Sequence, residues 1–133
     1  MSDSENTKIV EAAYAAFGRG DVEAILALLS DDVDWESFGP KAIPYTGNLR
    51  GKAQAATFFQ ILGTTTQFSE FAPEHFVAQG DMVIVLGRER FTVTATGREA
   101  DVHWAHAFTL RGGKIARFRE YSETDAIRRA YET

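Results

Sequence analysis

The chain of 133 residues contains no cysteine, only three histidines and only three prolines. The lack of cysteine excludes disulfides, a thiol nucleophile and any thiolate metal site. Basic residues number 14 against 19 acidic ones, and this net charge of −5 argues against nucleic acid as a partner. No apolar run approaches the roughly 18 residues that a membrane-spanning helix needs, so we expect no membrane association.

What the chain does contain is enough apolar sequence for one folded core. Hydrophobic residues make up 44% of it, including ten phenylalanines and two tryptophans. A chain of this length buries about two-thirds of its unfolded surface, so we expect a single domain over residues 1–133. The many aromatic rings predict either large core faces or a cavity walled by rings. Because the opening MSDSENTK lacks the apolar centre of a signal peptide, we expect a cytoplasmic protein.

Apolar spacing and turn residues predict helices in the first half of the chain. Ser2 and Glu5 have the spacing of a capping box, and the helix that follows is expected to stop at Gly18. Asp21 is typical of the N-cap of a second helix, whose apolar side runs to Leu29. A short strand is expected next, followed by a loop and a third helix; these span residues 33–38, 39–51 and 52–62.

The second half of the chain reads as strands followed by a short helix. Alternating apolar residues and turn dipeptides predict four strands, over residues 68–79, 82–94, 102–110 and 115–122. Thr124 is expected to cap a last helix that ends at Tyr131. A run of helices followed by a run of strands is typical of the α+β class, here in the order α-α-β-α-β-β-β-β with a short C-terminal helix.

The last predicted hairpin, HWAHAFTLRGGKIARFREYSE, carries an unusual set of polar groups. A two-residue Gly-Gly turn would place two arginines on the aromatic face of the hairpin. A three-residue turn instead opposes His106 to Phe118 and makes His106 and Glu120 diagonal neighbours on that face. We predict the second register because it separates apolar from charged residues better. It leaves Arg117 and Arg119 on an outer face, which is expected to be solvated; the alternative is a dimer contact with acidic residues of a second subunit.

A histidine and a glutamate among tryptophan and phenylalanine rings have two interpretations. They form either a satisfied core pair or an acid–base pair in a pocket, because a buried carboxylate must be paired, hydrogen-bonded or protonated. Tyr14, on the apolar stripe of the first helix, is likewise either a core tyrosine or a catalytic donor. His103 and His106 face opposite sides of a strand, so no shared metal is expected.

Several segments, in this order and spacing, resemble the SnoaL-like branch of the nuclear transport factor 2-like superfamily, which is related to polyketide cyclases and ketosteroid isomerase. They are AFGRGDVEAILALLSDDVDWE, PYTGNLRGKAQAATFFQIL and HWAHAFTLRGGKIARFREYSET. The resemblance implies a cone-shaped fold, in which a strongly curved antiparallel β-sheet wraps around the three helices of the N-terminal half and leaves an apolar pocket. It also implies a homodimer through the outer face of the sheet.

The same resemblance speaks against one specific mechanism. Ketosteroid isomerase uses an aspartate base with a tyrosine and a protonated aspartate as oxyanion donors. By the shared landmarks, Tyr14 matches the tyrosine, Ser37 stands at the position of the base and His106 stands at the position of the protonated aspartate. Serine cannot act as that base, so a standard ketosteroid isomerase is not expected.

We therefore expect an enzyme of the isomerase, cyclase or hydratase type that needs no metal or cofactor. It would act by general acid–base catalysis on a small, apolar, oxygen-bearing molecule, with His106, Glu120 and Tyr14 as catalytic residues. The alternative is a non-catalytic ligand-binding or dimeric accessory module of the same fold. The residues predicted to contact the ligand are Trp35, Ser37, Tyr45, Phe58, Phe59, Trp104 and Phe118.

Overall fold

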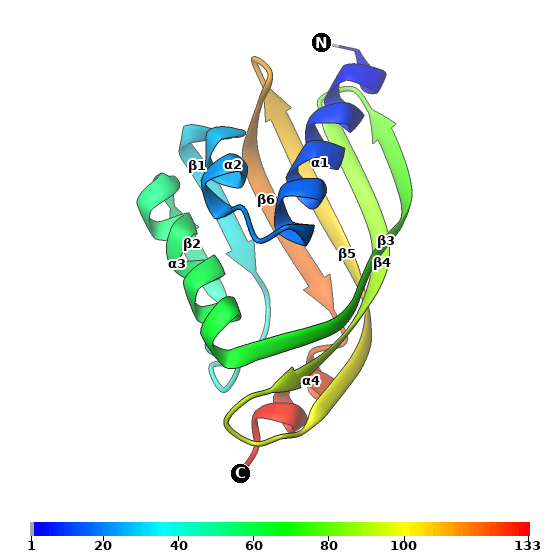
Figure 1. Ribbon diagram of the computed structural model, residues 1–133. Coiled ribbons are helices and arrows are strands. Elements are labelled where there is room, and N and C mark those ends of the chain that lie inside the picture. The colour runs from blue at the N-terminus through cyan, green and yellow to red at the C-terminus, as the bar shows by residue number, and fades with distance from the viewer. Residues whose placement is uncertain (1) are drawn as a thin grey trace.

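The computed structural model describes residues 2–133 (Figure 1). The helices are α1 (Asp3–Gly18), α2 (Val22–Ala27), α3 (Gly51–Thr65) and α4 (Thr124–Tyr131). The strands are β1 (Leu29–Ser37), β2 (Gly47–Arg50), β3 (Thr66–Gln79), β4 (Met82–Val93), β5 (Glu99–Arg111) and β6 (Lys114–Ser122). These strands form one sheet in the order β2-β1-β6-β5-β4-β3, and α1, α2 and α3 lie across one of its faces. The predicted α+β class is confirmed.

The sheet is mixed rather than antiparallel as predicted, because β1 runs parallel to β6. Alternating apolar residues indicate which face of a strand is buried, but they carry no information on the direction of its neighbour. The predicted loop 39–51 also contains β2, which pairs with β1 and covers its outer edge. The cone shape and strong curvature implied by the resemblance stay predictions.

The ends of the helices agree with the sequence at some positions and differ at others. The capping box of Ser2 and the N-cap of Asp21 are confirmed, and each side chain accepts a backbone N–H in the first turn of its helix. The second helix was predicted to reach Leu29, but it ends at Ala27 because Leu29 begins β1. Glu123, rather than Thr124, precedes the last helix.

The hairpin between β5 and β6 corrects the predicted register. Gly112 and Gly113 form a two-residue turn, and both have the left-handed φ values, 56° and 81°, that this turn requires. A β-bulge just after the turn then shifts the pairing by one residue, so that His106 lies directly opposite Glu120 rather than diagonal to it. The two side chains share the aromatic face as predicted, but through a turn and a bulge that the sequence did not reveal.

Arg119 was predicted to lie on a solvated face, and this prediction is wrong. Its side chain is 11% exposed and pairs with Asp34 of β1 at 3.0 Å and with Glu36 at 3.6 Å. The hydrogen bond from Arg119 holds the pKa of Asp34 below its usual range. Arg117, two residues earlier, is exposed as predicted. Arg119 therefore binds β6 to β1, the two strands whose parallel pairing was not foreseen.

Within residues 2–133, no helix has both the length and the apolar character that a membrane crossing demands.

Replacing Arg119 with methionine should destabilise the fold, because it leaves Asp34 and Glu36 without their buried counter-charge. We expect a loss of about 2–4 kcal/mol in the free energy of unfolding, measured by urea denaturation at neutral pH. The matched control, Arg117→Met, removes an exposed arginine from the same strand and should change stability by less than about 0.5 kcal/mol. Equal losses in the two variants would contradict the structural role of the ion pair.

Candidate functional site

Three polar side chains lie side by side across the inner face of the sheet. Ser37 on β1 is the partner of Glu120 on β6, and Glu120 is the partner of His106 on β5. Neighbouring strands are about 4.8 Å apart, so these side chains are within hydrogen-bonding reach of one another. The parallel pairing of β1 with β6 is therefore what brings the serine to the glutamate.

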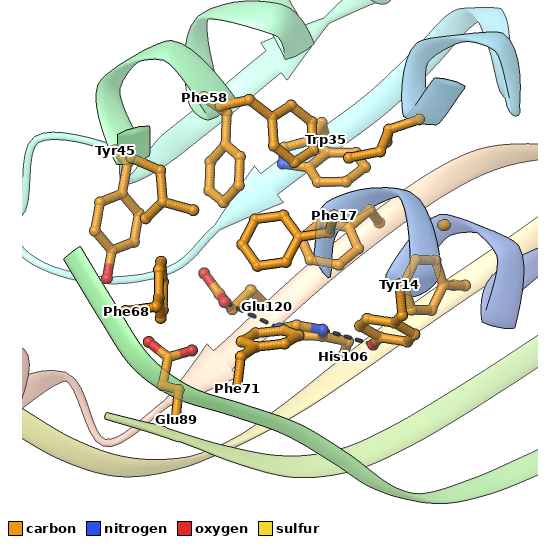
Figure 2. Close-up of a pocket in the computed structure, with 16 residues that line it drawn as sticks. Tyr14, Phe17, Trp35, Tyr45, Phe58, Phe68, Phe71, Glu89, His106 and Glu120 are labelled. Carbon is orange, nitrogen blue, oxygen red and sulfur yellow. Dashed lines mark hydrogen bonds and ion pairs between the residues drawn. The ribbon is translucent and has the colours of Figure 1, made fainter. Parts of the chain in front are cut away.

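A continuous chain of hydrogen bonds connects these residues to α1, and Figure 2 shows its links from Glu120 through His106 to Tyr14. The Ser37 hydroxyl donates to Glu120 Oε1 at 2.6 Å, and His106 Nε2 lies 2.9 Å from Glu120 Oε2. The other ring nitrogen, His106 Nδ1, lies 2.8 Å from the Tyr14 hydroxyl. All three predicted catalytic residues thus meet in one chain, in which both imidazole nitrogens are occupied.

The protons in this chain can be assigned from the environments of its two ends. Burial raises the pKa of Glu120, but the hydrogen bond and charge of His106 and the Ser37 hydroxyl lower it further, so the group is a carboxylate. Burial and the nearby charge of Glu120 raise the pKa of Tyr14, so its phenol keeps its proton. In the tautomer whose Nε2–H donates to Glu120, the Nδ1 atom of His106 can accept the hydrogen bond from the Tyr14 phenol.

Stacked rings hold the imidazole in place. The indole of Trp104 stacks on His106 with ring centroids 3.9 Å apart and planes 12° from parallel. Trp104 fits because Gly87, its partner on β4, has no side chain; a Cβ there would lie 2.5 Å from the indole. His106 is therefore fixed by packing as well as by its hydrogen bonds.

An apolar cavity of about 60 Å³ lies between the helices and this row. Two of the predicted contact residues, Ser37 and Trp104, do not line it. Ser37 instead donates a hydrogen bond to Glu120, and Trp104 stacks on His106. The predicted site residues that do line it are Tyr14, Trp35, Tyr45, Phe58, Phe59, His106, Phe118 and Glu120. Eight of the ten predicted site residues thus lie at the cavity, where they make up half of its 16 lining residues.

One polar residue of the wall was missed. Glu89 on β4 lines the cavity, and its side chain points inward with 6% exposure. The signal was visible in the sequence, since Val83, Val85, Gly87, Glu89 and Phe91 occupy one face of an alternating strand and only one of them is charged. A charged residue at a buried position of a strand is therefore a candidate functional residue, even where no recognised motif surrounds it.

Glu89 and Glu120 both line the cavity, but only the Glu120 carboxyl has hydrogen-bond partners among the described residues. No hydrogen bond or ion pair within the described part of the chain reaches the Glu89 carboxyl. Burial raises its pKa well above the usual value, and the negative charge of Glu120 raises it further. Tyr45, whose hydroxyl lies toward the same end of the cavity in Figure 2, has its pKa raised by burial and by both glutamates.

Three phenylalanines, together with Ile25 and Leu62, form the wall between the cavity and a surface cleft of about 270 Å³. Phe17, Phe59 and Phe68 line both spaces, and their rings come from α1, α3 and β3. The cavity is smaller than the roughly 150 Å³ void that admits benzene in a well-studied protein core. An aromatic ligand would therefore have to displace part of this wall toward the cleft.

Among residues 2–133, no group of three or more histidine, aspartate or glutamate side chains converges as a metal site would require.

Comparisons with known proteins agree with this fold. Residues 10–118 match the profile of the SnoaL-like domain. A nuclear transport factor 2-like protein from Burkholderia xenovorans is 37% identical, with 99% of each chain covered and a TM-score of 0.91. TerC, co-crystallised with polyporic acid, is 28% identical over 97% of this chain and 99% of its own, with a TM-score of 0.86.

A candidate polyketide cyclase from Xanthomonas campestris shares the fold at 22% identity, with 98% of each chain covered and a TM-score of 0.80. No protein with a curated description matches the chain.

Glu89→Gln should stabilise the protein increasingly as the pH rises. A glutamate whose folded-state pKa is raised ionises first in the unfolded chain, so wild-type stability falls above the unfolded value of about 4.3. The glutamine cannot ionise and escapes this loss. We expect its stability advantage to grow by about 1 kcal/mol or more between about pH 5.5 and about pH 8, measured by urea denaturation.

The control for this comparison is Glu11→Gln, which changes an exposed glutamate of α1. Its effect should be small and nearly independent of pH. A Glu89→Gln advantage that stays constant or shrinks as the pH rises would mean that Glu89 is ionised in the folded protein.

Proposed function

Because the chain belongs to the SnoaL-like family of the nuclear transport factor 2-like superfamily, we propose that it is a cofactor-free enzyme of the isomerase, cyclase or hydratase type. The observation that carries the proposal is the buried chain Tyr14–His106–Glu120, which ends at the wall of an apolar cavity. A phenol linked through an imidazole to a carboxylate is suited to moving one proton to and from a bound substrate.

In the proposed mechanism Tyr14 is the group that touches the substrate, since both His106 nitrogens are occupied. A proton leaves a carbon next to a carbonyl, or a hydroxyl, and binds the Tyr14 oxygen as the phenolic proton passes to His106 Nδ1. The carboxylate of Glu120 stabilises the imidazolium that forms. The reverse transfer returns the proton to a different atom of the substrate, so nothing is oxidised or reduced.

The walls of the cavity favour an apolar substrate. Phenylalanine, tyrosine and tryptophan rings make up most of the lining, and the polar groups are few. That TerC was co-crystallised with polyporic acid adds support for an oxygen-bearing organic ligand, since the two chains are 28% identical. A small, largely apolar molecule with at least one carbonyl or hydroxyl oxygen fits both observations.

The second candidate function is ligand binding without turnover. It is favoured by the full hydrogen bonding of His106 and Glu120, because a satisfied polar pair also serves to specify a core. The two candidates differ in whether a bound ketone loses protons to the protein.

Exchange of carbon-bound hydrogen for deuterium tests the proposed proton transfer without knowledge of the natural substrate. Small cyclic ketones such as 2-tetralone are incubated with the protein in deuterium oxide, and loss of the α-proton signal is followed by NMR. The wild type should exchange these protons faster than buffer. Tyr14→Phe and His106→Gln should each lose about 100-fold or more of that acceleration.

The matched control is His103→Gln. His103 lies three residues away on the same strand but faces outward, with a side chain that is 78% exposed and pairs with Glu123. This variant should exchange as the wild type does. If the wild type is no faster than buffer on a panel of such ketones yet binds them, the ligand-binding function holds instead.

We also propose a homodimer through the outer face of the sheet. Leu86, Ala105 and Tyr121 are cross-strand partners on that face, and the leucine and tyrosine are 45% and 51% exposed. Phe38 extends this row by packing on Tyr121, with ring centroids 5.0 Å apart. An exposed apolar row around a small alanine permits close approach of a second copy.

Leu86→Glu should dissociate this dimer, because it places an uncompensated carboxylate in an apolar contact. We expect sedimentation equilibrium to give twice the chain mass for the wild type and a single chain mass for the variant. Ala12→Glu, on the exposed side of α1, adds the same charge elsewhere and should leave the dimer intact. A monomeric wild type would overturn the proposed interface.

A further inference from the structure

Glu89 is the carboxyl group of the cavity wall that the proposed mechanism does not use. It lies on β4 between Phe71 of β3 and Val102 of β5, and its side chain faces the cavity. His106 pairs with Val85, four residues earlier on the same strand. Four residues of strand span about 13 Å, so Glu89 serves a different end of the cavity from Tyr14.

The carboxyl of Glu89 is buried without a protein partner. Glu120 has Ser37 and His106 as partners, but no described residue donates to Glu89 or accepts from it. Burial of an unpaired polar group destabilises a fold, and a leucine at this position would avoid that cost. A group kept in this state at a cavity wall has its hydrogen-bonding capacity free for a ligand.

The charge of the cavity decides which form this carboxyl takes. Glu120 already places one negative charge at the wall, and a second charge in the same apolar space is unfavourable. Burial and that neighbouring charge both raise the pKa of Glu89. Both effects favour the undissociated form of Glu89, which has one O–H donor and one carbonyl acceptor.

We propose that Glu89 binds a second oxygen of the substrate by donating its carboxyl O–H to it. The substrate is then a neutral molecule with two oxygen functions at opposite ends of an apolar or aromatic body. One oxygen meets Tyr14, and the other meets Glu89, with the Tyr45 hydroxyl toward the same end of the cavity as Glu89 (Figure 2). This inference rests on the proposed function for the location of the reacting end.

A pair of probe molecules isolates the second oxygen. 4-Hydroxyacetophenone and 4-ethylphenol have nearly the same shape and the same phenol, but only the former has a carbonyl oxygen. Their dissociation constants are measured by ligand-observed NMR below neutral pH, where both phenols are uncharged. The wild type should prefer 4-hydroxyacetophenone, and Glu89→Leu should weaken its binding by roughly three- to tenfold. Binding of 4-ethylphenol should not weaken.

Glu89→Gln serves as the conservative variant, since its amide N–H still donates. It should keep most of the preference for 4-hydroxyacetophenone. A preference that survives in Glu89→Leu, an equal loss for both probes, or no preference in the wild type would each overturn the proposal.

Infrared spectroscopy gives a readout that packing alone would not change. The difference spectrum of wild type minus Glu89→Gln should contain the carbonyl stretch of an undissociated carboxyl, and 4-hydroxyacetophenone should shift this band. An absent band, or a band that the ligand leaves in place, would contradict the proposal. Neither measurement involves turnover, so the proposal can hold even if the exchange assay finds no catalysis.

Discussion

The hydrogen bond between His106 and Glu120 is the interaction on which the rest of the site depends. It fixes the imidazole so that one nitrogen faces the carboxylate and the other faces Tyr14, and it keeps Glu120 ionised in an apolar interior. It exists because β5 and β6 place the two residues directly opposite each other. Removal of His106 would leave the buried Glu120 carboxylate with only the Ser37 hydroxyl as a partner, which destabilises a protein more than replacement of both groups.

Glu89 and Glu120 line the same cavity, but their different surroundings shift their pKa values in opposite directions. Glu120 accepts two hydrogen bonds and is held as an anion, whereas Glu89 accepts none from the described residues and has its pKa raised by burial. The anion also contributes to the neutrality of its neighbour, so the two states are linked. One side chain type thus supplies an electrostatic partner at one position and a hydrogen-bond donor at another.

The sequence predicted the α+β class, most helices and strands, and the shared face of His106 and Glu120, because each of these follows from local periodicity. It did not predict the parallel neighbour of β1, the short strand β2 or the bulge in β6, since these depend on contacts between segments distant in the chain. Arg119 was misplaced for the same reason: Asp34, its partner, lies 85 positions away. Glu89 differs, because its inward position was readable from the alternation of β4 alone.

The wall formed by Phe17, Phe59 and Phe68 has a consequence for which solutes reach the interior. Any molecule that travels from the surface cleft into the cavity passes between hydrocarbon rings. An ion on that path would shed its hydration with nothing to replace it, while an uncharged solute would lose little. For a solute that takes this route, discrimination against salts and charged metabolites would arise at the phenylalanine wall, before any contact with Glu89 or Glu120.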